Sequence, residues 1–308
     1  MESPHIPVLL NEVLNSFKEI KSGIILDCTL GYGGHSEAIL RSNPNLKIIA
    51  CDRDDDALSF CYEKFRPYKD RIEIHKSTFG TIFEKIKTND IKGILADIGV
   101  SSLQLDLNER GFSINSDTLD MRMDKSQTFD AKELINSYSL DELTRIFYKY
   151  GELPNAKSIA TKIVAYRQKK SKITSAKELA SIIGRSNLKN RSVLVATLVF
   201  QAIRIEVNKE LNELENLLKH IEDSKIKDAV LDIITFHSLE DRIVKTKFKE
   251  WEKSCICPNS ALKCECGNNH AIGKIVTKKP LSASKQEMQT NSRSSCAKLR
   301  TFRILRQK

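Results

Sequence analysis

Residues 24–36, IILDCTLGYGGHS, are the stretch that decides the fold. Residues 24–28 form a short apolar run that predicts a buried strand, and residues 34–41 predict a helix. The glycine-rich loop between them permits a tight turn and lets a ligand approach bare backbone. The start of the helix adds backbone N–H groups that have no partner within the helix. The stretch therefore predicts a strand, a binding loop and a helix in succession, which is the first unit of an α/β fold.

The alternation of strand and helix continues beyond this loop. Apolar runs predict strands at residues 46–51, 72–75 and 93–97, and residues 54–65 predict a helix with an acidic first turn. Strict alternation predicts a parallel sheet with helices on both faces. Near residue 228 the pattern resumes, with a strand, a helix and two final strands at residues 229–236, 239–251, 274–277 and 299–305.

A helical segment interrupts this pattern. Residues 105–130 are polar and irregular, and apolar spacings of three and four then predict one long helix through Phe200 and Ile221. We expect a discontinuous α/β domain, residues 1–104 plus 213–308, with a helical insertion at residues 105–212. Between the irregular segment and the long helix, four shorter helices are predicted at residues 131–137, 140–150, 155–170 and 176–183.

Length, composition and charge narrow the class of protein. A chain of 308 residues with 40% hydrophobic and 29% charged residues is typical of a globular protein and excludes a wholly disordered one. No apolar run is long enough to span a bilayer, and the N-terminus lacks the pattern of a secretory signal. The net charge is +10, and residues 242–308 alone carry +12. Such a cationic tail indicates either a polyanion partner, most often nucleic acid, or a solvated surface.

The eight cysteines fall into two groups. The scattered group predicts free thiols in a reducing cytoplasm, because no secretory signal accompanies it. The clustered group consists of two C-x-C pairs that could supply four zinc ligands, and a loop with free thiols is the alternative. The scattered cysteines are Cys28, Cys51, Cys61 and Cys296, and the clustered ones are Cys255, Cys257, Cys264 and Cys266.

Two cofactors fit the loop after the first strand. Asp52 ends the second strand, 21 residues after Gly31, where an acid would accept ribose hydroxyls of an adenine nucleoside. A dinucleotide needs the pattern G-x-G-x-x-G/A, and here Ser36 occupies the last position. S-adenosylmethionine has no pyrophosphate and does not need that small residue, while its cationic groups favour nearby acids such as Asp27. A glycine-rich turn without a ligand is the third interpretation.

Other side chains favour the methyl donor. Asp27, Asp52 and Asp97 each end a predicted strand, and Phe79 follows another. Ligands of open parallel sheets bind outside the carboxyl ends of the strands, so four such residues at one edge indicate a site. Phe79 could stack on adenine, and a core aromatic is its alternative role.

Short motifs along the whole chain resemble one family. Together they are similar to the bacterial ribosomal RNA small-subunit methyltransferase H family, also called RsmH or MraW, from residue 5 to about residue 300. Where the family commonly has a His-Pro pair and an Arg, this chain has Leu194, Val195 and Leu198. The motifs are residues 5–10 (HIPVLL), 27–36 (DCTLGYGGHS), 97–102 (DIGVSS), 104–106 (QLD), 110–113 (RGFS), 119–124 (LDMRMD), 200–205 (FQAIRI), 236–242 (FHSLEDR) and 292–294 (SRS).

The resemblance implies a fold, a reaction and a set of contacts. The fold would be the Rossmann-like sheet of class I S-adenosylmethionine-dependent methyltransferases with an inserted all-helical domain for RNA recognition. The reaction would methylate the exocyclic N4 amine of cytosine 1402 in 16S ribosomal RNA, near the P site of the small subunit. The protein would be cytoplasmic, without a membrane partner, and a homodimer is compatible with the sequence. By motif, the cofactor contacts would be Gly33, Gly34, His35, Asp52, Phe79, Asp97 and Gln104.

The chemistry of N4 methylation suggests which residues are catalytic. The N4 lone pair is delocalised into the ring, so a site must accept the N–H hydrogen bonds and align the amine with the methyl group. Asp97, or the hydroxyls of Ser101 and Ser102, could accept them. His237 could contact the base or take the departing proton, and a hydrogen-bonded structural histidine is the alternative. Stacking on the base would come from elsewhere, with Phe112 and Phe236 as candidates.

Basic residues are predicted to bind RNA phosphates, and a solvated face is the alternative. Other functions remain open: a methyltransferase for another base, a non-catalytic ribosome assembly factor, or a nicotinamide dehydrogenase, which Ser36 and the basic tail disfavour. The predicted phosphate contacts are Lys169, Lys170, Lys172, Arg185, Lys189, Arg191, Lys278, Lys279, Arg293, Lys298, Arg300 and Arg303.

Overall fold

The chain forms two compact units. The computed structural model describes residues 6–184, 186–187, 193–258, 260 and 263–306. Unit 1 consists of residues 1–99 and 212–308, and unit 2 consists of residues 100–211. No helix in the described ranges is long and apolar enough to cross a membrane. That the insertion folds as a domain of its own stays a prediction.

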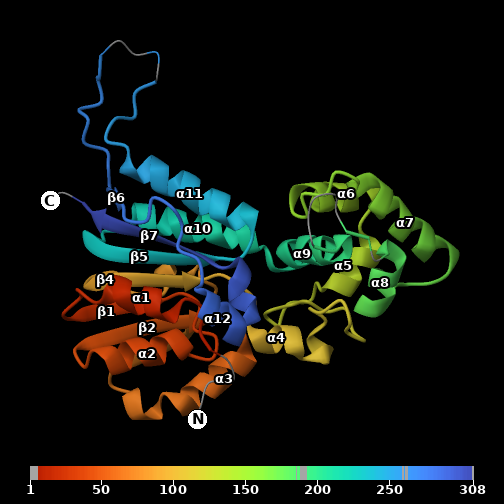
Figure 1. The fold of residues 1–308 in the computed structure, drawn as a ribbon, viewed down its shortest axis with the longest axis horizontal. Coiled ribbons are helices and arrows are strands. Elements are labelled where there is room, and N and C mark those ends of the chain that lie inside the picture. The colour runs from red at the N-terminus through yellow and green to blue at the C-terminus, as the bar shows by residue number, and fades with distance from the viewer. Residues whose placement is uncertain (1–5, 185, 188–192, 259, 261–262, 307–308) are drawn as a thin grey trace. The chain divides into compact units, whose positions relative to one another are not determined.

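Unit 1 is built on a sheet of seven strands in the order β3-β2-β1-β4-β5-β7-β6 (Figure 1). The first five strands of that order run parallel, whereas β7 is antiparallel to β5 and β6 is antiparallel to β7. The predicted Rossmann-like α/β sheet is confirmed, with an antiparallel edge added. The strands are β1 (Gly23–Asp27), β2 (Leu46–Asp52), β3 (Ile72–Lys76), β4 (Ile91–Asp97), β5 (Asp228–Thr235), β6 (Gly273–Ile275) and β7 (Lys298–Leu305).

Helices bury an apolar core against each face of this sheet. Neighbouring residues of a strand point to opposite faces, so Leu95 of β4 belongs to one core and Ile94 to the other. The core that contains Leu95 lies between the sheet and α1 (Leu10–Phe17), α2 (Gly34–Ser42), α3 (Asp55–Lys64) and α12 (Lys285–Thr290). The core that contains Ile94 lies between the sheet and α10 (Glu210–Asp223) and α11 (Ser238–Glu252). Unit 1 also contains the short 3-10 helices η1 (Arg66–Tyr68), η2 (Ile82–Glu84) and η4 (Ser292–Cys296), and unit 2 contains η3 (Asn108–Arg110).

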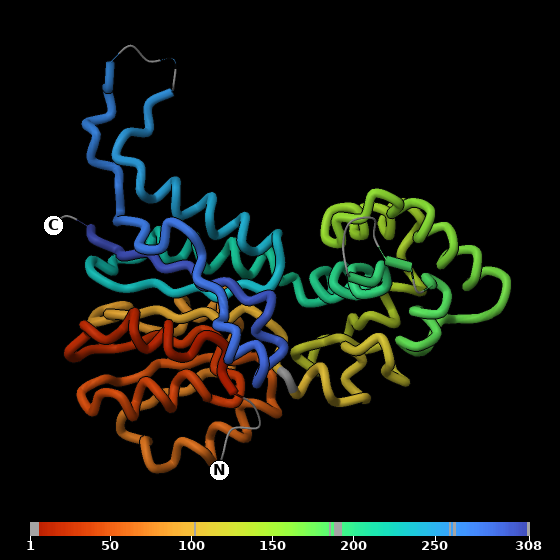
Figure 2. The backbone as a smooth tube through the Cα atoms, in the orientation of Figure 1, coloured from red at the N-terminus to blue at the C-terminus, as the bar shows by residue number. Residues whose placement is uncertain are grey.

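Unit 2 is helical, as predicted, and its described residues contain no strand beyond an isolated bridge between Asn187 and Leu194. Its core is apolar, with Phe147 and Ile203 fully buried. Figure 2 follows the chain through these helices. They are α4 (Ser102–Asp106), α5 (Ala131–Ser137), α6 (Leu140–Lys149), α7 (Ala156–Lys169), α8 (Ala176–Ile183) and α9 (Val195–Asn208).

The single long helix predicted through Phe200 and Ile221 is wrong. The chain breaks at Lys209, whose φ of 53° is left-handed, and α10 starts at the next residue. The buried amide of Asn208 explains the break. Its Nδ2 donates to the carbonyl of Met121 at 2.8 Å, and its Oδ1 accepts from the N–H of Met123 at 2.8 Å. Contacts distant in sequence therefore fix a bend that apolar spacing cannot reveal.

Candidate functional site

The carboxyl ends of the parallel strands meet along one edge of the sheet, where open α/β sheets bind ligands. β1, β2 and β4 end at Asp27, Asp52 and Asp97. The register pairs Asp27 with Ala50 of β2 and with Leu95 of β4. The structure thus brings the three predicted carboxylates to one edge, which we call the carboxylate edge.

Asp52 holds the glycine-rich loop. Its Oδ2 accepts a hydrogen bond from the N–H of Gly31 at 2.7 Å, and its Oδ1 accepts one from the N–H of Asp54 at 2.9 Å. Burial raises the pKa of Asp52, although these bonds favour the ionised form. Each carboxylate oxygen keeps a second lone pair. Asp52 can therefore hold the loop and still accept hydrogen bonds from ribose hydroxyls.

The glycines of the loop have different reasons to be glycine. Gly33 has a φ of 71°, and a Cβ there would lie 2.4 Å from the ring of Phe65. A Cβ on Gly34 would lie 2.3 Å from Pro7. Packing therefore excludes side chains at both predicted cofactor contacts. A Cβ on Gly31 would meet no atom of the described residues within 4 Å, so the space beside its Cα is open, while its N–H donates to Asp52 and its carbonyl accepts from Cys61 Sγ. Sequence reasoning did not include Gly31 among the contacts.

Asp27 connects β1 to the start of α2. Its buried carboxylate accepts hydrogen bonds from Ser36 Oγ at 2.6 Å and from the N–H of Thr29 at 3.1 Å. Burial raises the pKa of Asp27, and these bonds oppose that rise. The serine that departs from the dinucleotide pattern thus has a structural partner here.

His35 and Asp97 place buried polar atoms at the carboxylate edge. His35 Nε2 lies 3.6 Å from Asp97 Oδ2, which is too far for a hydrogen bond. In the described part of the chain, neither ring nitrogen of His35 nor Asp97 Oδ1 has a hydrogen-bond partner. The backbone N–H of Asp97 donates to Thr29 Oγ1 at 2.7 Å, which sequence reasoning missed. Unpaired polar atoms in a buried position indicate a place for a polar ligand.

His237 lies at the start of α11 and caps it. Its Nδ1 accepts from the N–H of Glu240 at 3.5 Å, and its Nε2 lies 2.9 Å from Glu240 Oε1. The buried Glu240 also accepts from the N–H groups of Phe236 at 2.8 Å and His237 at 3.2 Å. The cap through Nδ1 favours the structural role, whereas the buried Nε2 has no hydrogen-bond partner among the described residues. A catalytic role for His237 stays a prediction.

The remaining predicted site residues have mixed surroundings. Phe79 is 9% exposed and packs in the apolar core beside α10, so its stacking on adenine stays a prediction.

Ser101 and Gln104 belong to unit 2, where they form a capping box for α4. The N–H of Gln104 donates to Ser101 Oγ at 3.2 Å, and the N–H of Ser101 donates to Gln104 Oε1 at 3.1 Å. Ser102 is the first residue of α4. The roles of these three residues stay predictions.

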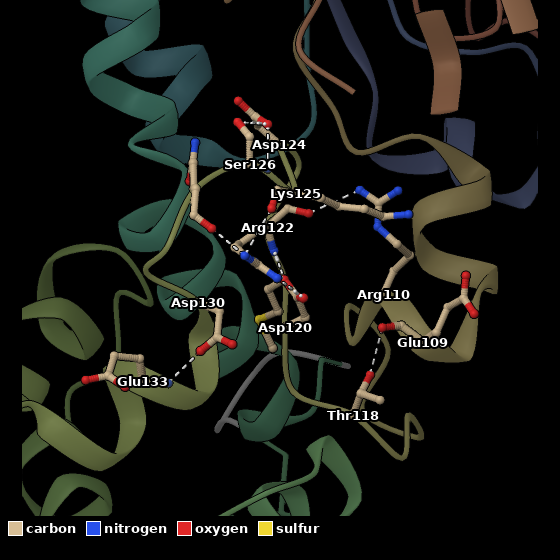
Figure 3. A network of polar contacts seen from close by, with 12 residues as sticks. Glu109, Arg110, Thr118, Asp120, Arg122, Asp124, Lys125, Ser126, Asp130 and Glu133 are labelled. Atoms are coloured by element: carbon tan, nitrogen blue, oxygen red, sulfur yellow. Dashed lines mark hydrogen bonds and ion pairs between the residues drawn. The ribbon is translucent and has the colours of Figure 1, made fainter. Parts of the chain in front are cut away.

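The family motif at residues 119–124 forms a polar network inside unit 2 (Figure 3). Arg122 binds both carboxylate oxygens of Asp120, at 2.8 and 2.7 Å, and also donates to the carbonyl of Lys125 at 3.2 Å. Burial raises the pKa of Asp120, but the hydrogen bonds and charge of Arg122 outweigh burial and hold it below its ordinary value. The buried Arg110 donates to the carbonyls of Arg122 and Met123 at 3.1 and 3.2 Å. The motif therefore holds an irregular segment in one conformation.

Some of the basic residues predicted to contact RNA phosphates are already paired with carboxylates of the protein. The buried Arg300 binds both carboxylate oxygens of Asp241, at 2.7 and 3.1 Å, which removes it from the predicted set. Arg303 pairs with Asp228 at 2.5 Å. Lys169, Lys170, Lys172, Lys278 and Lys279 are exposed, whereas Arg185, Lys189 and Arg191 lie outside the described residues.

Comparison with known proteins decides the family. The model of the MraW methylase family matches residues 2–305. The chain belongs to the MraW methylase family. Ribosomal RNA small subunit methyltransferase H of Campylobacter fetus subsp. fetus is 73% identical over 99% of both chains, and its namesake from Campylobacter hominis is 60% identical over 99% of this chain and 100% of the other. A crystal structure of an rRNA methylase from Streptococcus thermophilus matches 98% of this chain and 99% of its own at 8% identity, with a TM-score of 0.44.

MraW methylases use S-adenosylmethionine as the methyl donor. The carboxylate edge of this family member fits that donor by its own chemistry. Asp52 offers acceptors for hydroxyl groups, and Gly31 leaves open space beside its Cα. His35 and Asp97 offer buried polar atoms without a protein partner among the described residues. The ribose hydroxyls, the adenosyl group and the cationic sulfonium end of S-adenosylmethionine are complementary to these three features in turn.

Proposed function

We propose that this MraW-family methylase transfers the methyl group of S-adenosylmethionine to the exocyclic N4 amine of cytosine 1402 in 16S ribosomal RNA of the small subunit. The observation that carries the proposal is the match over 99% of both chains to a ribosomal RNA small subunit methyltransferase H. The geometry of the carboxylate edge supports it independently, because it suits an adenosyl donor.

The donor supplies an electrophilic methyl group on a sulfonium. Asp52 would accept hydrogen bonds from its ribose hydroxyls while holding the glycine-rich loop through the N–H of Gly31. His35 and Asp97 Oδ2, which lie 3.6 Å apart at the start of α2 and the end of β4, would orient its polar end. The N-terminus of α2 contributes its backbone N–H groups for a carboxylate.

The amine of the cytosine is the weak partner in this reaction. One N–C bond forms, one S–C bond breaks with its electron pair staying on sulfur, and one proton passes from the cationic N4 to solvent. Asp97 Oδ1 accepts a hydrogen bond from N4 and so concentrates the lone pair on nitrogen. No strong base is needed, because the methylated amine is cationic until it loses this proton and is therefore acidic. Positioning and electrostatics supply the rate.

The substrate defines the partner and the compartment. The small ribosomal subunit and its 16S RNA are the partner, the protein acts in the cytoplasm, and residues 105–212 recognise RNA. Exposed lysines of both units, including Lys170 and Lys278, bind phosphates. A homodimer stays a prediction.

A labelling experiment tests this function. The protein is incubated with methyl-labelled S-adenosylmethionine and either free 16S RNA or small subunits that lack the modification, and the RNA is digested to nucleosides. We expect label on N4-methylcytidine. Label on another base would replace the proposed target, and RNA binding without label would favour a non-catalytic assembly factor.

The variant Asp97→Asn tests the role proposed for the carboxylate of Asp97. Because it removes the negative charge beside the reacting amine, the methylation rate should fall by about 100-fold or more. Asp90→Asn is the control, since the exposed Asp90 directly precedes the opposite end of the same strand, β4. Equal activity of the two variants would contradict the role of Asp97.

A further inference from the structure

The described residues 253–258 and 263–272, between α11 and β6, form an arm of unit 1, and the four clustered cysteines lie on it. The two halves of the arm run side by side as they leave these elements (Figures 1 and 2). Backbone hydrogen bonds close its base: the N–H of His270 donates to Ser254 O at 3.0 Å, and the N–H of Ile272 donates to Trp251 O at 2.9 Å. The two C-x-C pairs lie beyond this base, on opposite halves of the arm, so they face each other across it.

The sulfur atoms of these pairs converge. The distances are 3.6 Å from Cys255 to Cys264, 3.6 Å from Cys264 to Cys266 and 3.7 Å from Cys266 to Cys255. Cys257 completes the group, and all four Sγ atoms lie within 4.8 Å of one another. Four thiolates around a tetrahedral zinc ion, at Zn–S distances of about 2.3 Å, have sulfur atoms about 3.8 Å apart. The observed separations therefore match a tetrahedral thiolate site.

The backbone around the cluster also favours thiolates. The N–H of Ile256 donates to Cys266 Sγ at 3.4 Å, and the N–H of Glu265 donates to Cys257 Sγ at 3.3 Å. Each donor belongs to one C-x-C pair and each acceptor to the other. Gly267 follows the second pair with a φ of 81°, which turns the chain directly after the sulfur ligand. Such N–H groups stabilise negative charge on sulfur and orient the ligands.

We infer that Cys255, Cys257, Cys264 and Cys266 bind one structural zinc ion that fastens the two halves of the arm together. The thiols release their protons to solvent on binding, and all four positions around the metal are filled by protein. A site of this kind has no open position for a substrate, so the ion stabilises the arm and takes no part in methyl transfer.

Neither a disulfide nor apolar packing accounts for the cluster. The sulfur atoms are farther apart than the roughly 2.05 Å of a disulfide bond, and all four cysteines are free thiols. Burial of apolar surface does not explain the gathering, because Cys264 is exposed and the other three are only partly buried. A metal ion supplies the attraction that packing does not.

Metal analysis of the full-length protein tests the inference. The protein is produced in zinc-supplemented medium, purified without chelator and analysed for transition metals. We expect about one zinc ion per chain, and near-complete loss of zinc in Cys264→Ser. Cys296→Ser is the matched control and should keep the metal, because Cys296 is an exposed thiol outside the cluster.

Cobalt substitution gives a second readout that does not depend on the folding of a variant. Metal-free wild-type protein titrated with Co²⁺ should develop the thiolate-to-metal absorption and the visible bands of tetrahedral cobalt, and Zn²⁺ should abolish them. Zinc-free wild-type protein with no cobalt spectrum would overturn the inference. So would a Cys264→Ser variant that holds as much zinc as wild type, or a disulfide between cluster cysteines in protein purified under reducing conditions.

Discussion

At the scale of single residues, Asp52 combines two tasks in one side chain. Its oxygens already accept the N–H groups of Gly31 and Asp54, so the carboxylate fixes the loop before any ligand arrives. A ligand that adds hydroxyl donors uses lone pairs that are already oriented. The affinity for an adenosyl donor should therefore depend strongly on the charge at this position.

Asp52→Asn should weaken S-adenosylmethionine binding by about tenfold or more, because a hydrogen bond to a charged acceptor contributes about 1.5–3 kcal/mol. Isothermal titration calorimetry measures the change. Asp55→Asn is the control, since Asp55 is exposed and pairs with Lys76 at 2.7 Å. Unchanged affinity in Asp52→Asn would contradict the proposed hydrogen bonds between Asp52 and the ribose hydroxyls.

Asp232 is a buried acid in β5 with no part in the proposed chemistry. Its carboxylate accepts from Thr301 Oγ1 at 2.6 Å and from Ser16 Oγ. Burial raises the pKa of Asp232 from 3.8 to about 7, although both hydroxyl contacts oppose this rise. Between these two values the folded state holds a proton that the unfolded state has lost. The stability that this proton gives is complete below pH 3.8 and disappears as the pH rises through 7.

Asp232→Asn should remove this pH dependence, because the amide resembles the protonated acid. Relative to the variant, the wild type should lose up to about 4 kcal/mol of unfolding free energy between about pH 4 and pH 8. Urea denaturation at several pH values measures the difference. Asp70→Asn changes an exposed acid and should show no such trend. A difference between wild type and Asp232→Asn that does not vary with pH would show that the pKa of Asp232 is the same in the folded and unfolded states.

At the scale of elements, the boundary between α9 and α10 shows where local pattern fails. Apolar residues continue through it at helical spacing, yet Lys209 adopts a left-handed conformation. Arg204 crosses the break and binds both oxygens of Glu210 at 2.9 Å. Together with the amide of Asn208, this pair holds the bend at the cost of an unfavourable backbone conformation at Lys209.

Lys209→Gly should raise the free energy of unfolding by about 0.5–1 kcal/mol, because glycine adopts a positive φ without a steric penalty. Lys219→Gly, at an exposed position within α10, should instead lower it by about 1 kcal/mol. Chemical denaturation of the full chain compares the two. Destabilisation by both variants would mean that the bend is not strained.

Most elements of unit 1 follow from local signals. The runs at residues 46–51 and 93–97 coincide with β2 and β4 because buried parallel strands read as continuous apolar segments. α1 and α12 were missed because they have only 8 and 6 residues, although Ser284, three residues before Glu287, marks the start of α12 as an N-cap. The antiparallel direction of β7 depends on its pairing with β5, which no local pattern encodes.

The site was predictable to a similar degree. Asp27, Asp52 and Asp97 were found because they end strands, and strand ends meet by topology. Thr29 and Glu240 were missed because their roles depend on partners brought close by folding. Arg300 was misassigned to phosphate binding, since a sequence shows its charge but not the carboxylate of Asp241 beside it.

At the scale of the whole molecule, the positive charge is concentrated in the C-terminal tail. Residues 242–308 carry +12, but Arg300 and Arg303 are paired with Asp241 and Asp228. Lys278 and Lys279 are exposed and precede β7. They are therefore the better candidates in the tail for contacts with RNA phosphates.

The double variant Lys278→Glu with Lys279→Glu should bind small-subunit RNA less tightly and with a weaker salt dependence. Loss of two phosphate contacts should reduce the slope of log affinity against log salt by about 1.5. Filter binding over a range of salt concentrations measures this slope. The control reverses Lys18 and Lys21, which are exposed before β1. If the slope of log affinity against log salt is the same in both double variants, Lys278 and Lys279 belong to a solvated surface and do not contact RNA phosphates.

The central claim is that the carboxylate edge holds the methyl donor, and a crystal structure with S-adenosylmethionine or its demethylated product tests it most directly. The account predicts ligand density beside Gly31, with the ribose hydroxyls within hydrogen-bond distance of Asp52 and the sulfur end beside His35 and Asp97. Density for the ligand at any other place on the protein, with these side chains left unengaged, would contradict it.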